Sequence, residues 1–246
     1  MIKVFFVRHA QSDNSWKDDK SRPLTIQGQQ DKQIVLQFLK DKAIDNFYCS
    51  PYLRSINTIA DSADYFKKGI ILDARLRERE NGPTGYNLIM TERRWADTSW
   101  HEEGGESIAA VQDRNIAALK DILTASKKEH QDTTIVIGTH GTALSTILNY
   151  YDSSYDCDAF FRIVNWMPYI IELNFDGETL VEKVEHTYIE KSFWDPLKSK
   201  PRLKLVLPTI EHKDAAIAYR QEHFDRGEHK FLVMVVLMKR KIMNCG

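Results

Sequence analysis

Two hydrophobic periods alternate along the first 150 residues, one typical of buried strands and one typical of helices. Residues 1–7, 47–49, 70–72 and 133–137 are short apolar, β-branched or aromatic runs, and each predicts a strand. Apolar residues at helical spacing lie between them and predict helices over residues 26–39, 50–68, 106–128 and 143–150. Ser50 and Pro51 predict the start of the second helix, with the serine side chain as its cap.

This alternation predicts an α/β fold, a three-layer α/β/α sandwich with a mostly parallel central sheet covered by helices on both faces. Residues 169–175 and 180–187, separated by Asp176 and Gly177, predict an antiparallel hairpin that closes the sheet. Residues 81–105 predict a loop-rich insertion. This insertion could close over a substrate, or its aromatic side chains could pack as a small satellite core, which we expect for both tryptophans. Its aromatic and basic residues are Tyr86, Arg93, Arg94, Trp95, Trp100 and His101.

Composition narrows the function classes. The 246 residues include 34 basic and 35 acidic side chains, for a formal net charge of −1, so the positive field of a general nucleic-acid binder is absent and any anion site is local. No apolar run approaches the roughly 20 residues that cross a bilayer. The first ten residues do not resemble a signal peptide, and three cysteines (Cys49, Cys157, Cys245) show no CxxC spacing. We therefore expect a cytoplasmic protein without nucleic-acid or membrane partners. The sequence does not predict its oligomeric state.

Two histidines, His9 and His140, each follow a predicted strand. Ligands bind at the carboxyl ends of the strands in open α/β sheets, so both histidines are expected to face one crevice. A neutral imidazole is a nucleophile, and a phosphoryl group needs fixed cations and N–H donors around its oxygens. Arg8, Arg54, His140 and the backbone N–H of Gly141 can supply these donors. Each residue alone has a simpler reading, as a structural histidine or a solvated charge, and the combination favours a site for a small phosphorylated substrate.

A leaving alcohol needs a proton, so a carboxylic acid should stand near the histidines. The segment 73–80 contains three carboxylates, and we favour Glu78 over Glu80 although spacing alone does not separate them. Either could instead pair with a neighbouring arginine. A metal site fits poorly, because Arg8 beside His9 would repel a divalent cation and no H-x-x-x-H or paired-aspartate spacing occurs. No Walker-type phosphate loop is present either, and we expect neither metal nor cofactor.

These residues resemble the histidine phosphatase superfamily, which includes cofactor-dependent phosphoglycerate mutases and fructose-2,6-bisphosphatases, over about residues 1–190. Five motifs match in the correct order: R-H-[GA] at Arg8-His9-Ala10, L-T-x-x-G at Leu24, Thr25 and Gly28, S-x-x-x-R-[AS]-x-x-T at Ser50, Arg54, Ser55 and Thr58, L-x-E at Leu76-Arg77-Glu78, and H-G at His140-Gly141.

The resemblance implies that His9 attacks phosphorus and becomes a phosphohistidine. It implies that Arg8, Arg54 and His140 bind the transferring phosphoryl group, while Glu78 protonates the leaving oxygen and then activates water. No metal is implied, and Glu78 is favoured over the other carboxylates of its segment.

One departure concerns substrate binding. Many members place a phosphate-binding asparagine six residues after the nucleophile, where this chain has Ser15, with Asn14 one position earlier. Either side chain could donate to an oxygen. The chain lacks the longer insertions of the mutases, so the expected function is metal-independent hydrolysis of small phosphate monoesters. A mutase-type phosphotransferase and a phosphate-binding regulatory protein with little turnover are the alternatives.

The composition changes after Lys191, where prolines punctuate a basic stretch. We expect a histidine phosphatase domain over residues 1–192 and a linker over residues 193–201. Residues 202–229 resemble the opening strand and helix of a GNAT-type acetyltransferase, without its glycine-rich pyrophosphate loop. Residues 202–246 are therefore expected to be an incomplete acetyltransferase-like fragment without acetyl transfer, ending in either a frameshifted fusion remnant or an ordinary β extension.

Overall fold

The computed structural model describes residues 1–83, 88–127, 132–191 and 217. A six-stranded sheet runs through it in the order β3-β2-β4-β1-β5-β6. The strands are β1 (Ile2–Arg8), β2 (Asn46–Cys49), β3 (Ile70–Leu72), β4 (Thr133–Thr139), β5 (Trp166–Asp176) and β6 (Thr179–Glu190). The first four are mutually parallel, and β5 and β6 join antiparallel as a hairpin. The predicted mostly parallel sheet with a closing hairpin is confirmed.

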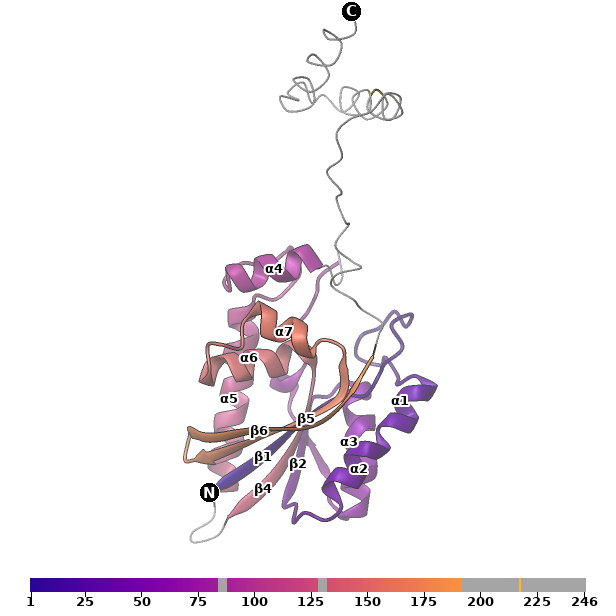
Figure 1. The fold of residues 1–246 in the computed structure, drawn as a ribbon, viewed down its shortest axis with the longest axis vertical. Helices are drawn as coiled ribbons and strands as arrows, with labels where there is room; N and C mark the ends of the chain where they lie inside the picture. The colour runs from indigo at the N-terminus through magenta and orange to yellow at the C-terminus, as the bar shows by residue number, and fades with distance from the viewer. Residues whose placement is uncertain (84–87, 128–131, 192–216, 218–246) are drawn as a thin grey trace, which may run out of the picture. The chain divides into compact units, whose positions relative to one another are not determined.

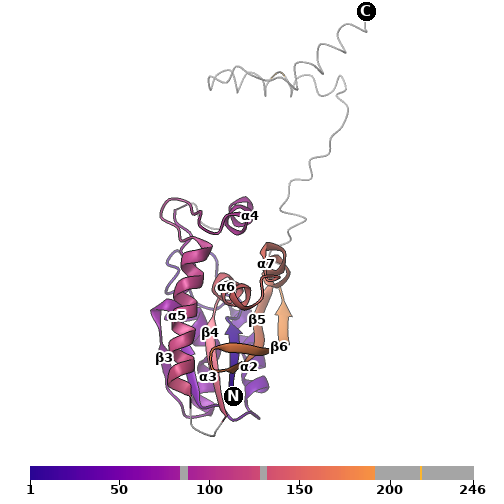
Figure 2. The same ribbon diagram turned by 90° about the vertical axis from the view of Figure 1, so that its left-hand side faces the viewer.

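Helices lie on both faces of this sheet (Figures 1 and 2). They are α1 (Ile26–Asp31), α2 (Gln33–Leu39), α3 (Leu53–Tyr65), α4 (Leu88–Ala96), α5 (Ile108–Ser126), α6 (Gly141–Tyr151) and α7 (Cys157–Ile163), with a short 3-10 helix, η1 (Ala74–Leu76). Val4 and Phe6 of β1 join a core with α5 and α6. Phe5 and Val7 point the other way, into a second core with α2 and α3. This alternation confirms the three-layer arrangement.

The strand register aligns the ends of three parallel strands. Arg8 of β1 stands opposite Thr139 of β4, and Cys49 of β2 stands opposite Gly138 of β4. The residues that follow these strands therefore emerge at one edge of the sheet, where α/β proteins bind ligands.

Two helix predictions need correction. The helix expected over residues 26–39 is two helices that meet at Lys32. The helix expected from Ser50 begins only at Leu53, and its N-cap residue, Tyr52, makes no side-chain capping bond. The Ser50 hydroxyl instead accepts the Tyr52 N–H over 3.2 Å and lies 2.7 Å from Nε2 of His140. The predicted cap is wrong because this serine is turned toward the strand ends.

The insertion of residues 81–105 contains α4, which the sequence did not predict, and α4 packs on another unpredicted helix, α7. Trp95 lies 6.2 Å from Phe160, centroid to centroid, and the guanidinium of Arg93 stacks 3.9 Å over Trp100. The expected satellite packing is therefore observed for Trp95, whereas the contact of Trp100 is with the exposed guanidinium of Arg93. Tyr86 lies outside the described residues.

A buried ionic cluster holds the insertion to the loop after η1. The Glu102 carboxylate pairs with Arg79 at 2.7 Å and with Arg94 at 2.5 Å, and all three side chains are buried. Burial favours protonation of Glu102, but the hydrogen bonds from Arg94 and Arg79 outweigh it and lower the pKa of Glu102 to about 2. Two of the insertion's charged side chains are thus structural.

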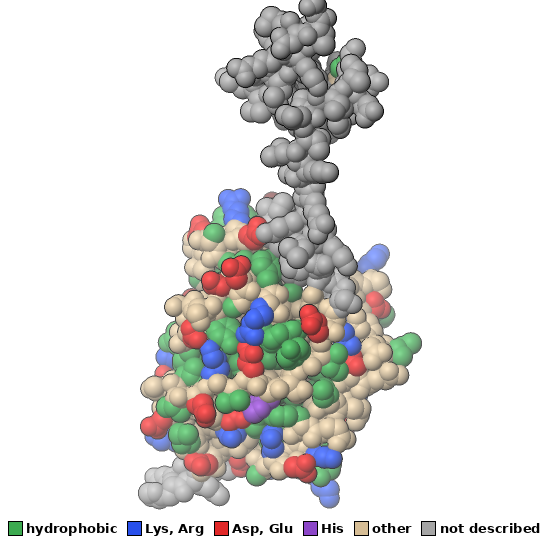
Figure 3. All heavy atoms as spheres, in the orientation of Figure 1, with side chains coloured by type: hydrophobic (Ala, Val, Ile, Leu, Met, Phe, Trp, Pro, Cys, Tyr) green, Lys and Arg blue, Asp and Glu red, His purple; other side chains and the backbone are tan. Residues whose placement is uncertain are grey.

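Acidic and basic side chains are interspersed over the described part of the face seen in Figure 3, with neither sign dominating. Within the described ranges, no helix has the length and apolar character needed to cross a bilayer. The chain divides into two units, residues 1–200 and 201–246. The first is described through Lys191, apart from two internal gaps, and the second only at Ile217. The predicted linker and acetyltransferase-like fragment lie almost wholly outside the described residues and stay predictions.

Candidate active site

His9 and His140 follow neighbouring parallel strands and lie side by side at the carboxyl edge of the sheet. The backbone N–H of His9 donates to the carbonyl of Thr139 over 3.1 Å. The centroids of the two imidazole rings are 5.3 Å apart, in an edge-to-face arrangement at 62°. The structure thus brings together the two histidines that the strand pattern singled out.

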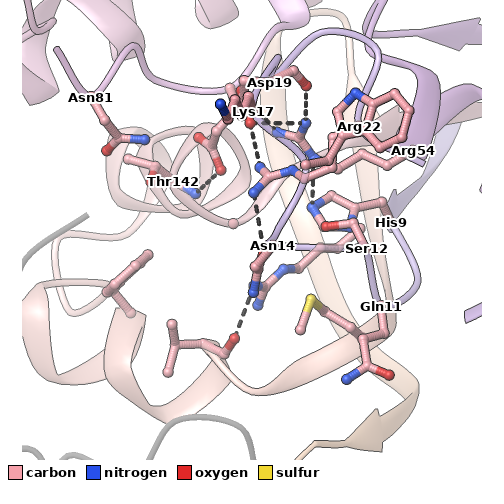
Figure 4. A pocket seen from close by; sticks show the side chains of 17 residues that line it. His9, Gln11, Ser12, Asn14, Lys17, Asp19, Arg22, Arg54, Asn81 and Thr142 are labelled. Atoms are coloured by element: carbon pink, nitrogen blue, oxygen red, sulfur yellow. Dashed lines mark hydrogen bonds and ion pairs between the residues drawn. The ribbon is translucent and has the colours of Figure 1, made fainter. Parts of the chain in front are cut away.

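The backbone that follows His9 selects one tautomer of its ring. Nδ1 lies 2.7 Å from the carbonyl oxygen of Ala10, and because a carbonyl can only accept, Nδ1 carries the proton. Nε2 then holds the lone pair, and the Nε–H of Arg54 donates to it over 3.2 Å (Figure 4). Burial, followed by the charges of Arg54 and Arg8, holds the pKa of His9 well below its ordinary value. The imidazole is therefore neutral near pH 7, the form that can act as a nucleophile.

Thr58 of α3 ties the His9 loop to this helix. Its Oγ1 accepts the backbone N–H of Ala10 over 2.9 Å and donates to the carbonyl of Arg54, one turn earlier, over 2.7 Å. The threonine of the S-x-x-x-R-[AS]-x-x-T pattern thus links the loop that carries the histidine to the helix that carries the arginine.

Arg54 projects from α3 and is the most deeply buried cation of the site, with 1% of its side chain exposed. Besides His9, its guanidinium contacts Asp19: Nη1 donates to the backbone oxygen over 2.6 Å, and Nη2 lies 3.3 Å from Oδ2. Burial, followed by repulsion from Arg22, lowers the pKa of Arg54. The arginine nevertheless stays charged, since the pKa of a guanidinium starts far above neutrality.

Arg8 ends β1, and its guanidinium reaches the last turn of α7. Nη1 donates to the carbonyl of Ile163 over 2.5 Å and Nη2 donates to that of Val164 over 2.9 Å. A cation at a helix C-terminus is stabilised by the helix dipole. Gly141 lies against the other side of this group, because a Cβ placed there would be 3.2 Å from Nη2. The glycine of the H-G motif lets the arginine approach the start of α6.

Glu78 caps α6 from another part of the chain. Its carboxylate accepts the N–H groups of Thr142 over 3.0 Å and Ala143 over 3.1 Å, and that of Arg79 over 2.8 Å. Its side chain lines the same cavity as His9. Glu80, the alternative acid, is half exposed, lies 3.4 Å from Nε of Arg77 and does not line this cavity. Glu80 is therefore the partner of a neighbouring arginine, which was the alternative role considered for both carboxylates, whereas Glu78 faces the site.

Arg114 of α5 holds the backbone of the segment that carries Glu78. Its guanidinium donates to the carbonyls of Arg75 over 2.6 Å, Arg77 over 2.7 Å and Glu78 over 3.1 Å. The Glu106 carboxylate balances its charge at 2.8 Å. Sequence reasoning missed this anchor, because Arg114 looks like a surface charge of an amphipathic helix.

His140 is fully buried and does not line the cavity. It lies beneath His9 and against Tyr52, with ring centroids 5.3 Å apart in each pair. Its Nε2 lies 2.7 Å from Oγ of Ser50, and its Nδ1 is a buried atom with no hydrogen-bond partner in the described part of the chain. Burial, followed by the charge of Arg54, holds the pKa of His140 well below its ordinary value.

A cavity of about 520 Å³ opens over His9 at the carboxyl edge of the sheet. Its charged side chains are four cations, Arg8, Lys17, Arg22 and Arg54, and two carboxylates, Asp19 and Glu78 (Figure 4). Its other walls are formed by Gln11, Ser12, Asn14, Trp16, Asn81, Gly141, Thr142, Phe160, Val164 and Met167. Across the described ranges, no cluster of three or more His, Cys, Asp or Glu side chains could hold a metal ion. The excess of cations suits an anionic ligand.

The structure separates the two candidates for the phosphate-binding amide position. Asn14 lines the cavity, and its Oδ1 accepts from Nη1 of Arg22 over 3.0 Å. Ser15 is exposed, its hydroxyl donates to Oδ1 of Asp13 over 2.7 Å, and it does not line the cavity. Lys17, Asp19 and Arg22 were missed as site residues; the density of charge between the R-H-A and L-T-x-x-G motifs was the signal that could have found them.

Comparison with known proteins gives relatives of this chain. The family described as "Histidine phosphatase superfamily (branch 1)" matches residues 4–185. A probable phosphoglycerate mutase, GpmB, from Enterobacter sp. (strain 638) is 28% identical over 165 residues, which cover 61% of this chain and 74% of that relative.

Two solved structures show the same fold at low sequence identity. A mycobacterial glucosyl-3-phosphoglycerate phosphatase matches with a TM-score of 0.59 at 15% identity, over 77% of this chain and 99% of that chain. A phosphoserine phosphatase from Entamoeba histolytica, in complex with phosphoserine, matches with a TM-score of 0.61 at 19% identity, over 76% and 96%. Because the family match covers well over half of the sequence, this chain belongs to branch 1 of the histidine phosphatase superfamily.

Proposed function

We propose that this protein is a metal-independent phosphatase that hydrolyses small phosphate monoesters through a phosphohistidine on His9. The observation that carries the proposal is the neutral His9 ring, whose Nε2 lone pair lies 3.2 Å from Nε of the buried Arg54 beside a cavity rich in cations. A nucleophile next to fixed guanidinium donors is the arrangement that phosphoryl transfer requires.

In the first step, Nε2 of His9 bonds to phosphorus as the ester P–O bond breaks. The leaving oxygen takes a proton from Glu78, which acts as the general acid. Arg54 and Arg8 carry the charge of the equatorial oxygens, and Gly141 and Thr142 at the start of α6 line the same cavity. In the second step, Glu78 removes a proton from water, water oxygen bonds to phosphorus, and the P–N bond breaks to release inorganic phosphate and the free imidazole.

The test is to trap the intermediate. The protein is mixed with a ³²P-labelled aryl phosphate and quenched in alkali, where phosphohistidine survives. We expect label on the wild-type chain and none on His9→Ala, while His101→Ala, which changes an exposed histidine of the insertion, keeps it. Turnover should be unaffected by a chelator. Label on His9→Ala or loss of activity with chelator would contradict the proposal, and absence of any turnover would favour a phosphate-binding regulatory protein.

Phosphoglycerate mutase activity is the second candidate, because the Enterobacter relative is named a probable mutase. A mutase returns the phosphoryl group of the phosphohistidine to a second substrate oxygen instead of to water. Interconversion of 2- and 3-phosphoglycerate that requires catalytic 2,3-bisphosphoglycerate would establish this activity. Steady release of inorganic phosphate without that requirement would favour the phosphatase.

A further inference from the structure

The carboxylate of Asp19 lies between two arginines of the cavity. Its Oδ1 pairs with Nη2 of Arg22 and lies 3.2 Å from Nη1 of Arg54. Its Oδ2 lies 3.3 Å from Nη2 of Arg54. One carboxylate of the chain thus occupies an anion position that two guanidinium groups share.

This anion position differs from the position at which His9 would attack phosphorus. Arg54 turns its Nε toward Nε2 of His9 and its two Nη atoms toward Asp19. One edge of the Arg54 guanidinium therefore contacts His9 and the other edge contacts Asp19. A ligand with a single phosphoryl group at His9 would leave the edge that faces Asp19 to another anion.

Two cations of the cavity, Arg22 and Lys17, have no part in the proposed hydrolysis. The side chain of Arg22 is only 21% exposed, and its Nε is a buried donor without a hydrogen-bond partner among the described residues. Lys17 lies on the wall of the same cavity. The charge of Arg22 also contributes to the lowered pKa of Arg54 and of His9. Since Arg22 and Arg54 share Asp19, one small ligand can reach both Arg22 and the reacting centre at His9.

We propose that Arg22, with Lys17, is a specificity determinant that binds a second anionic group of the substrate, a carboxylate or a second phosphate, in the position that Asp19 holds in the free protein. This inference rests on the proposed function, because it concerns the ligand of the same cavity. Asp19 is 41% exposed and belongs to the polar loop of residues 13–22. It can be displaced by a ligand whose second anion makes the same contacts, whereas a substrate without one leaves Asp19 in place.

The test measures binding and needs no turnover. In a His9→Asn background, which prevents phosphoryl transfer, calorimetry compares 3-phosphoglycerate with glycerol 3-phosphate, which carries a hydroxymethyl group in place of the carboxylate. Charge-assisted, forked hydrogen bonds predict about 10-fold or greater preference for 3-phosphoglycerate. Adding Arg22→Gln should remove the preference, because it lowers the affinity for 3-phosphoglycerate far more than the affinity for glycerol 3-phosphate. Propane-1,3-diol bisphosphate, compared with propanediol monophosphate, tests a second phosphate in the same way.

Two further variants complete the test. Asp19→Asn removes the internal competitor and should strengthen binding of 3-phosphoglycerate. Arg162→Gln changes an exposed arginine that pairs with Glu185 outside the cavity, and it should preserve the preference. Arg22→Lys keeps the charge and should retain part of the preference if the glutamine variant folds poorly.

An unchanged preference in folded Arg22→Gln, or equal affinity for both members of each ligand pair in the parent, would overturn the inference. Neither result bears on whether His9 is phosphorylated. Conversely, an enzyme with no turnover whose ligand preference depends on Arg22 would refute the phosphatase and leave this binding site standing.

Discussion

The Nε–H of Arg54 points at the Nε2 atom of His9 across 3.2 Å, in a place where almost no surface of either side chain reaches solvent. The arginine therefore touches the one ring nitrogen that is free to attack. A water-poor site strengthens such a contact, because the effective dielectric constant is low.

Arg54→Lys should lower kcat/KM for an aryl phosphate by about 100-fold or more, since one fixed charged donor is lost while the charge is kept. Steady-state kinetics at saturating and limiting substrate measure the change. Arg162→Lys makes the same substitution at an exposed position and should leave the kinetics unaltered. A decrease of less than a few-fold in Arg54→Lys would mean that the Nε–H of Arg54 does not serve the reacting group.

Glu78→Gln should slow hydrolysis most for substrates with poor leaving groups, because these need the proton most. We expect a small loss for p-nitrophenyl phosphate and about 100-fold or greater loss for an alkyl phosphate. The amide also places an NH₂ group against the N–H of Thr142 or Ala143, so the free energy of unfolding should fall by ~1–3 kcal/mol. The ratio of the rate decreases for the two substrates does not depend on this loss of stability. An equal decrease in rate for both substrates would contradict the role of general acid.

Arg114 is expected to position Glu78 without touching substrate. Arg114→Lys cannot bridge the three carbonyls of residues 75, 77 and 78, so kcat should fall by about 10- to 100-fold through misplacement of the acid, with KM within about 2-fold. The loss should be larger for alkyl than for aryl phosphates, as in Glu78→Gln. Lys120→Gln, on the exposed side of the same helix, is the control. A substrate-independent decrease would indicate general destabilisation instead.

The two buried histidines should make the protein less stable in mild acid. Burial, aided by Arg54, lowers the pKa of His9 and His140, so the folded state keeps both neutral while the unfolded chain binds protons below about pH 6.5. The free energy of unfolding should then fall as the pH drops from 6.5 to 5.5, by up to ~1.4 kcal/mol per pH unit for each histidine. The free energy of unfolding, measured with urea across this pH range, should depend less steeply on pH in His140→Gln than in the wild type. An equal dependence on pH in both proteins would refute this account.

Gly28→Ala should destabilise the start of α1. A Cβ at this position would lie 2.1 Å from the carbonyl oxygen of Gln11, which also accepts the backbone N–H of Thr25 over 3.0 Å. The backbone must shift, at a cost of ~1–3 kcal/mol, and the loop after His9 shifts with it. Gly69→Ala, where a Cβ meets nothing within 4 Å, should change stability by less than about 0.5 kcal/mol. Thermal unfolding of the pair distinguishes crowding from the general effect of replacing glycine.

The sequence alone was sufficient for the class of fold and for the pair of histidines at its centre. Buried parallel strands appear as apolar runs because both faces of the sheet are covered, and their ends are marked by the first polar residues. His9 and His140 stand at two such ends, so topology places them together. The amphipathic pattern of α5 and the hairpin of β5 and β6 were readable for the same local reasons.

Contacts between distant segments decided the rest. Spacing alone leaves Glu78 and Glu80 equivalent, and the sequence favours Glu78 only through the L-x-E resemblance. In the structure the two differ because the Glu78 carboxylate meets the start of α6, more than sixty residues later, whereas Glu80 pairs with Arg77. Ser50 has the local sequence signal of a helix cap, but in the structure its hydroxyl lies within hydrogen-bond distance of Nε2 of His140.

The loop of residues 13–22 shows no hydrophobic period, because its positions are set by ion pairs of Asp19 with Arg22 and Arg54 and not by burial in a strand or helix. The local hydrophobic pattern of a sequence indicates which segments are buried. The charged side chains of this cavity are instead positioned by ion pairs with residues that come close only in the folded chain.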